Sequence, residues 1–209
     1  MSPEQTCLEQ LNQVEPVAGP TYPAPHPPSF IVWRDEWTLH VDFMDEDHRC
    51  LAAILNHIAP DICRCAEGGW NWAIGARLLS RLETLGAHTR EHFRREEQAM
   101  RASDYPAFVQ HKAEHDLLLA EYTVMLRDIR SAGPPSLELG TLNALKQWLI
   151  GHVLDDDKAL ADYLLSNAAA AAPAVAGLAR RRLVVPDWQE PLSGAQADPL
   201  RTEAAGWRG

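Results

Sequence analysis

The chain has 209 residues, of which 46% are hydrophobic, and its formal net charge is −10. This length suits one domain of roughly 100–150 residues with extensions, and the hydrophobic share allows a packed core. The acidic balance argues against a nucleic-acid partner, because neutralising phosphates takes clustered Lys and Arg side chains. The longest run of small apolar residues, 168–179, is too short to span a membrane. The first residues also lack the basic and apolar stretches of a secretory signal, so we expect a cytoplasmic protein without a membrane partner.

Prolines mark the expected domain boundaries, since seven of the fifteen fall before residue 30 and four lie after residue 172. Residues 1–30 are predicted to be a disordered proline-rich extension, and residues 31–168 a helical domain. Residues 169–209 are predicted to be a largely irregular tail. The tail contains RRRLVVPDW, with Trp188, which is either a docking motif for a protein partner or a segment folded onto the domain.

Hydrophobic residues repeat at helical intervals in four stretches, which are separated by Gly- and Pro-containing breaks. The predicted helices cover about 44–65, 72–102, 107–131 and 136 or 137 to 168. Short connections favour antiparallel neighbours, so the expected fold is all-α, an up-down-up-down four-helix bundle. Residues 31–43 are expected to cross the bundle as an extended arm, without forming a sheet.

Two residue pairs suggest a metal centre: His92 with Glu96, and His111 with His115. Each pair is spaced i, i+4, which places both side chains on one helix face. Further candidates come from the other two helices, and the full set is His48, His92, Glu96, His111, His115, His152 and an aspartate near residue 157. Imidazole with carboxylate suits iron, zinc or copper, and a bridging carboxylate suits two irons best. Seven ligands are too many for one ion and about right for two.

The last aspartate is ambiguous. Five residues of regular α-helix turn through about 500°, which leaves His152 and Asp157 about 140° apart. Asp156, at i+4, is the simpler ligand by geometry, but a π-bulge would bring Asp157 closer to the face of His152.

The remaining polar candidates are given structural roles. We expect no metal role for His26, His40 and His57. A structural role is favoured for His88, with a place behind the ligands or a gate as alternatives. The residues expected to form a solvated face of the second helix are Arg90, Arg94, Arg95 and Glu97.

The segments MDEDHRCL, HFRREEQAM, HKAEH and WLIGHVLDDDKAL resemble the hemerythrin family, specifically the bacterial hemerythrins, over about residues 31–168. The resemblance selects Asp157 over Asp156 and implies two oxo- or hydroxo-bridged irons with Glu96 and Asp157 as bridging ligands. It also implies that His111, His115 and His152 complete the coordination of one iron. His48 and His92 would bind the other iron, which keeps one open coordination position for O2. Independently of the resemblance, the candidate histidines have apolar neighbours in the sequence that are expected to form a dry shell, namely Leu51, Phe93, Leu118 and Trp148.

The function implied by this resemblance is reversible dioxygen binding by a carrier, store or supply protein rather than by an enzyme. A histidine-rich ligand set favours reversible binding over O–O cleavage, since neutral ligands stabilise high-valent iron less than carboxylates do. A diiron oxidase or peroxidase, an iron-handling protein and an O2 or redox sensor remain alternatives. A monomer is favoured over an oligomer.

Overall fold

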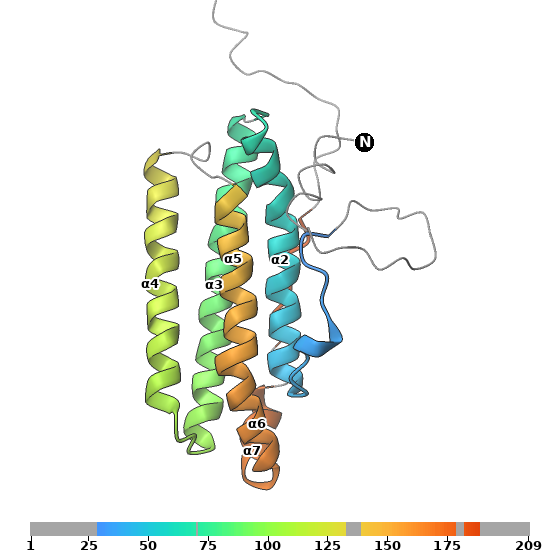
Figure 1. Ribbon diagram of the computed structural model, residues 1–209, viewed down its shortest axis with the longest axis vertical. Coiled ribbons are helices and arrows are strands. Elements are labelled where there is room, and N and C mark those ends of the chain that lie inside the picture. The colour runs from blue at the N-terminus through green and yellow to red at the C-terminus, as the bar shows by residue number, and fades with distance from the viewer. Residues whose placement is uncertain (1–28, 70, 133–138, 179–181, 189–209) are drawn as a thin grey trace, which may run out of the picture.

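The computed structural model describes residues 29–69, 71–132, 139–178 and 182–188, and within them it is helical and contains no strand. Four long helices lie side by side and alternate in direction (Figure 1). They are α2 (Asp42–Ala66), α3 (Trp72–Ala102), α4 (Phe108–Ala132) and α5 (Leu139–His152), and α5 continues through η3 (Val153–Asp157) and α6 (Lys158–Ser166). The predicted all-α, up-down-up-down bundle is therefore confirmed. No helix in these ranges has the length and apolar character needed to cross a membrane.

The helix ends follow local sequence signals. The Asn71 side chain caps α3 by accepting a hydrogen bond of 2.9 Å from the backbone N–H of Ile74. The Asp45 carboxylate accepts hydrogen bonds from the backbone N–H groups of Leu39 and His40 at 2.8 and 3.0 Å, which ties the arm to the start of α2. At the opposite end of α2, Gly68 follows the helix with a φ of 78°, a conformation that glycine adopts without strain.

The N-terminal arm crosses the bundle as expected, and it includes one 3-10 turn, η1 (Asp35–Trp37). The Asn56 side chain both accepts from and donates to the backbone of Ile31, at 2.7 and 2.9 Å. Phe30 is 1% exposed. The packed arm therefore begins at least one residue earlier than predicted, while the rest of the predicted extension, 1–28, lies outside the described residues.

Buried aliphatic side chains of all four long helices fill the bundle. Helix α3 meets α4 closely at Gly86. A Cβ on Gly86 would lie 2.7 Å from the ring of Tyr122, so this contact requires glycine. The Tyr122 hydroxyl donates a 2.6 Å hydrogen bond to the Leu82 carbonyl, which fixes the register of the two helices.

The first part of the predicted C-terminal tail differs from the prediction, while residues 179–181 and 189–209 lie outside the described residues. Its first residues form helix α7 (Ala168–Leu178), which packs against α3 and α6. The prediction missed this helix because an alanine run has high helix propensity but no apolar periodicity to reveal it. Residues 182–188 are irregular, as expected, and Leu183, Val185 and Trp188 pack against the core.

Candidate metal centre

All four helices of the bundle contribute side chains to one buried cluster near the end where α2 begins and α3 ends. His48 comes from α2, His92 and Glu96 from α3, and His111 and His115 from α4. His152 and Asp157 come from the last residue of α5 and of η3. The structure thus brings together all seven side chains predicted as ligands, each at most 9% exposed.

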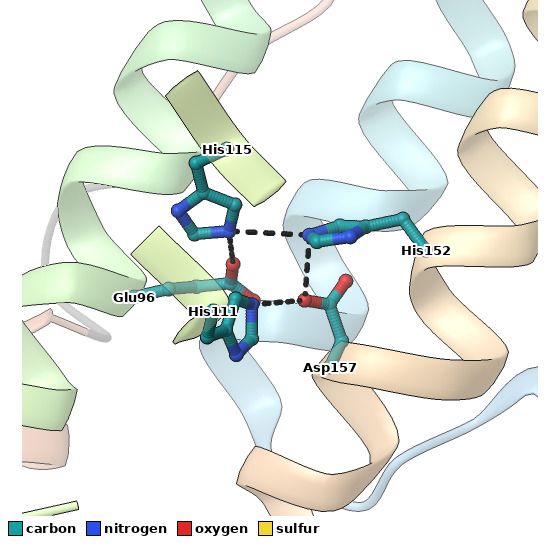
Figure 2. Close-up of side chains that lie close together, drawn as sticks. All are labelled: Glu96, His111, His115, His152 and Asp157. Atoms are coloured by element: carbon teal, nitrogen blue, oxygen red, sulfur yellow. Dashed lines mark hydrogen bonds and ion pairs between the residues drawn. The ribbon is translucent and has the colours of Figure 1, made fainter. Parts of the chain in front are cut away.

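The first donor group is drawn in Figure 2 and consists of Glu96, His111, His115, His152 and Asp157. The Nε2 atoms of His111 and His152 lie 3.2 and 3.1 Å from Asp157 Oδ1. The Nε2 atom of His115 lies 3.3 Å from Glu96 Oε2. Two donors bound to one ion at about 2.1 Å and at right angles lie about 3.0 Å apart, so these spacings suit a single metal.

The second donor group consists of His48, His92, Glu96 and Asp157. The Nε2 atom of His48 lies 3.1 Å from Asp157 Oδ2, and that of His92 lies 3.5 Å from Glu96 Oε1. Each carboxylate therefore directs one oxygen to each group. This arrangement suits two ions joined by two bridging carboxylates.

The π-helical turn η3 gives the two neighbouring aspartates different positions. A π-turn has i→i+5 hydrogen bonding, which places residues five apart near one face. Asp157 consequently faces His152 inside the cluster, at 0% exposure. Asp156 lies behind the ring, 34% exposed, with Oδ2 3.4 Å from His152 Nδ1.

The carboxylate oxygens of Glu96 and Asp157 are buried, and they face the ring nitrogens of the candidate histidines. A buried carboxylate charge is costly unless a cation balances it. In the metal-free protein, burial and the neighbouring Asp157 charge raise the pKa of Glu96 well above its usual range. Burial opposes ionisation of Asp157 too, but His152 and His111 bring its pKa well below the usual range. The donor set therefore fits a pair of cations that neutralises both carboxylates.

The histidine pKa values diverge for the same reason. Burial alone would lower the pKa of His92 and His152, but the carboxylates of Glu96 and Asp157 raise both histidine pKa values to about 10. Burial, together with the charge of His152, lowers the pKa of His115 to about 2. Metal binding must displace the protons held on His92 and His152, since only unprotonated imidazole nitrogens bind metal.

Three carboxylates outside the cluster face the Nδ1 atoms of ligand candidates: Asp47 faces His92 at 3.4 Å, Glu97 faces His115 at 3.6 Å, and Asp156 faces His152 at 3.4 Å. A carboxylate that accepts a hydrogen bond from Nδ1 orients the ring and leaves Nε2 for a metal, whereas the contact of Glu97 with His115 is too long for a hydrogen bond. No sequence pattern pointed to Asp47, which pairs with a residue 45 positions away.

The expected solvated face of α3 is wrong for two of its four members. Arg95 is 1% exposed, and the Glu97 side chain is 15% exposed. The sequence around Arg95 and Glu97 has no clear apolar periodicity. It therefore gives no sign that neighbouring elements cover this part of α3 on several sides.

The other histidines are not in either donor group. The two ring nitrogens of His88 lie 3.0 Å from the carbonyl oxygens of Thr84 and Val184. His57 contacts Trp188, and His40 lies at the start of α2. His26 lies outside the described residues.

A small cavity adjoins the cluster, with a volume of about 10 Å3. Its lining residues are Leu51, Thr89, His92, Phe93, Trp148, Leu149, His152 and Asp157. Three of the four residues expected to form an apolar shell are among them, while Leu118 is not. Trp148 also lines an outer groove of about 190 Å3 between α4 and α5, so its side chain separates the groove from the cavity.

Comparison with known proteins agrees with this arrangement. The family model described as Hemerythrin HHE cation binding domain matches residues 39–164. The chain is 27% identical over 139 residues to a bacteriohemerythrin of Stenotrophomonas maltophilia, covering 66% of this chain and 84% of that protein. It is 28% identical over 123 residues to a bacteriohemerythrin of Methylococcus capsulatus, covering 59% of this chain and 87% of the relative.

The similarity extends to a myohemerythrin. The chain is 28% identical over 130 residues to myohemerythrin-1 of Phascolopsis gouldii, which covers 62% of this chain and 91% of that protein. No solved structure matches the chain significantly. The match of the family model over more than half of the chain, on a four-helix bundle with a buried His and carboxylate cluster, shows that the protein belongs to the hemerythrin family of cation-binding domains.

Proposed function

We propose that this protein binds dioxygen reversibly at a non-haem diiron centre and acts as an oxygen carrier or store rather than as an enzyme. The residues that would hold the irons are His48, His92, Glu96, His111, His115, His152 and Asp157. When bound, the iron pair supplies the electrons and the coordination position needed for reversible O2 binding. Residues of the chain supply the rest: charge balance, orientation and exclusion of water.

One observation carries the proposal: Glu96 and Asp157 each place one oxygen in each of the two donor groups. A site for a single ion has no use for this duplication. The two groups are also unequal, because one includes three histidines and the other two. The group with two histidines is therefore one donor short, which supports a position for an added ligand there.

The surroundings favour binding of a small apolar molecule over chemistry that needs water or protons. The cavity beside His92 is bounded by Leu51, Phe93 and Trp148, and its volume suits a molecule about the size of water or O2. The Phe93 ring stacks on the His115 ring, with 3.8 Å between the ring centroids. The Trp33 ring lies roughly parallel to the His48 ring, with 6.2 Å between the centroids. These aromatic walls limit solvent access to the centre and so would slow loss of the ferrous state.

The ligand set also favours a carrier over an oxidase. Five of the seven proposed ligands are imidazoles, which bind metal in their neutral form, and the two carboxylates belong to both donor groups. Carboxylate-rich sets stabilise high-valent iron better, so this set favours release of intact O2.

The test is a cycle of oxygenation on iron-loaded protein. The protein is reduced without air, exposed to O2, and then evacuated while its visible spectrum is recorded. We expect a charge-transfer band that appears with O2 and bleaches under vacuum over several cycles. Immediate and irreversible conversion to the ferric form would contradict the carrier function and favour the oxidase alternative.

The cytoplasmic location, the monomeric state and the absence of a nucleic-acid partner stay predictions from the sequence. Cell fractionation tests the first, and sedimentation of the iron-loaded protein tests the second. A nucleic-acid shift assay at low salt tests the third, since electrostatic binding is strongest there.

A further inference from the structure

The C-terminal strap, which we define as α7 and residues 182–188, lies outside the region matched by the hemerythrin family model, 39–164. Leu178, the last residue of α7, is 4% exposed and belongs to the core. The strap therefore adds a packed element to the family's bundle, against α3 and α6.

Residues 182–188 fasten the strap along α2 and α3. The Val184 carbonyl lies 3.0 Å from His88 Nε2, and the Trp188 ring meets His57 edge-on at 5.2 Å. The Arg182 guanidinium pairs with Glu46 at 2.9 Å on the surface, where its side chain is 70% exposed. The contacts of Val184 and Trp188 hold residues 182–188 against α3 and α2.

The strap reaches the interior through Arg95. The Nη2 group of Arg95 donates a 2.6 Å hydrogen bond to the carbonyl oxygen of Leu178. That carbonyl stands at the C-terminal end of α7, where the last backbone oxygens have no partner within the helix and the helix dipole favours a cation. Arg95 is thus bound to the strap by a backbone group whose position depends on the docking of α7.

The same guanidinium also holds Asp47. Its Nη1 group donates to Asp47 Oδ1, and both side chains are at most 1% exposed. The other oxygen of Asp47, Oδ2, lies 3.4 Å from His92 Nδ1. A continuous chain of contacts therefore runs from Leu178 through Arg95 and Asp47 to the imidazole of His92.

We propose that Arg95 is a positioning residue through which the C-terminal strap holds His92 in the metal centre. Arg95 keeps Asp47 in place, and Asp47 keeps a proton on Nδ1 of His92, so that Nε2 faces Glu96 and Asp157. This inference rests on the proposed role of His92 as a ligand. His92 belongs to the donor group with two histidines, so its orientation bears on the position where an added ligand would bind.

The test compares three single variants and one double variant, Arg95→Met with Leu178→Gln, of the full-length, iron-loaded protein. Arg95→Met removes both hydrogen bonds but keeps an aliphatic stem. Leu178→Gln weakens the docking of α7 and leaves the side chains of Arg95, Asp47 and His92 unchanged. Arg182→Ala, the matched control, removes only the exposed ion pair of the strap, and such pairs contribute little. Circular dichroism checks that each variant is folded. Trypsin cleavage after Arg182, a site that the control variant lacks, reports detachment of the strap in the parent, Arg95→Met and Leu178→Gln proteins.

The main readout is the rate at which ferrous iron passes to an excess of chelator. Losing a partner behind a ligand typically weakens a metal site 10–100-fold, so we expect Arg95→Met and Leu178→Gln each to lose iron about tenfold faster. Arg182→Ala should match the parent protein, and the double variant should be no faster than Arg95→Met alone. A folded Arg95→Met protein that holds iron like the parent would overturn the proposal. Faster loss in the double variant than in either single variant would also overturn it, because the two residues would then act independently.

A second readout does not depend on iron. In the metal-free protein, the Nδ1 proton of His92 should give a nitrogen-15 NMR signal protected from exchange with water. We expect this signal to be lost in Arg95→Met and Leu178→Gln and kept in Arg182→Ala. Absence of iron from the parent protein would contradict the proposed function, while the NMR result would still decide whether the strap positions His92.

Discussion

His152 and Asp157 are five residues apart, and Asp157 Oδ1 nevertheless lies 3.1 Å from His152 Nε2. In a regular α-helix these two side chains would point about 140° apart. The π-helical turn Val153–Asp157 removes that difference and turns Asp157, rather than Asp156, into the cluster. The turn therefore assigns the two neighbouring aspartates different surroundings.

The first prediction separates these two aspartates. Asp157→Asn should weaken iron binding by more than about 100-fold, because it removes a charge shared by both donor groups, while Asp156→Asn should cost only about tenfold, since Asp156 acts through His152. Iron per chain after dialysis against a graded chelator series measures both. Equal losses in the two variants would contradict the assignment.

The second prediction concerns pH and the metal-free protein. The folded-state pKa values of His92 and His152 are raised to about 10, from an unfolded value near 6.5. The stability that these two groups contribute is complete below pH 6.5 and is lost as pH rises from there to 10. The loss is at most about 1.4 kcal/mol per pH unit for each histidine. Urea unfolding of chelator-treated protein between pH 6.5 and 9.5 should show falling stability.

Glu96 changes stability in the same direction, because its raised pKa also means that a proton favours the folded state. Iron-loaded protein is the control: the metals replace those protons, so its stability should fall much less over the same range. Stability of the metal-free protein that is flat or rises above pH 6.5 would show that the two histidines do not hold protons in this way.

The third prediction concerns access to the centre. Trp148 lines both the outer groove and the inner cavity, so Trp148→Ala should join them and speed autoxidation about tenfold. Met125 lines only the groove, so Met125→Ala should leave the rate near that of the parent. Decay of the oxygenated spectrum in air measures the rate. Identical decay in the parent and in Trp148→Ala would place the route of entry elsewhere.

The fourth prediction concerns the packing of α3 on α4. Gly86→Ala places a Cβ 2.7 Å from the Tyr122 ring and should destabilise the fold by about 1–3 kcal/mol. Gly140→Ala is the control: a Cβ added there would meet no atom of a neighbouring element within 4 Å, so the change should be neutral or slightly stabilising. Thermal unfolding compares the two. A Gly86→Ala protein as stable as the Gly140→Ala protein would mean that the two helices can separate at little cost.

Much of the bundle could be predicted from the sequence, because its helices show an apolar period and end at Gly, Pro or capping residues. The range 72–102 predicted for one helix matches α3 at both ends. Spacings of i, i+4 are enough to pair His92 with Glu96 and His111 with His115 without any tertiary contact. The choice between Asp156 and Asp157 could not be made from spacing alone, because a π-turn has no sequence signature. Only the family resemblance favours Asp157.

The parts that could not be predicted depend on long-range contacts. Asp47 and His92 are 45 residues apart, and Arg95 and Leu178 are 83 apart, so no local pattern joins them. Arg95 has the charge of a surface residue, and only the fold shows that α7 and Asp47 bury it. Helix α7 itself was missed because a run of alanines has no polar face to give a period.

The most direct test of a diiron oxygen carrier is to measure oxygen uptake and iron content on the same sample. Reduced, iron-loaded protein is equilibrated with a known amount of O2 in a closed vessel and then evacuated, and the gas taken up and released is measured. We predict two irons per chain, and one O2 taken up per iron pair and recovered under vacuum. A single iron per chain, or O2 that is consumed and not recovered, would contradict the proposed function.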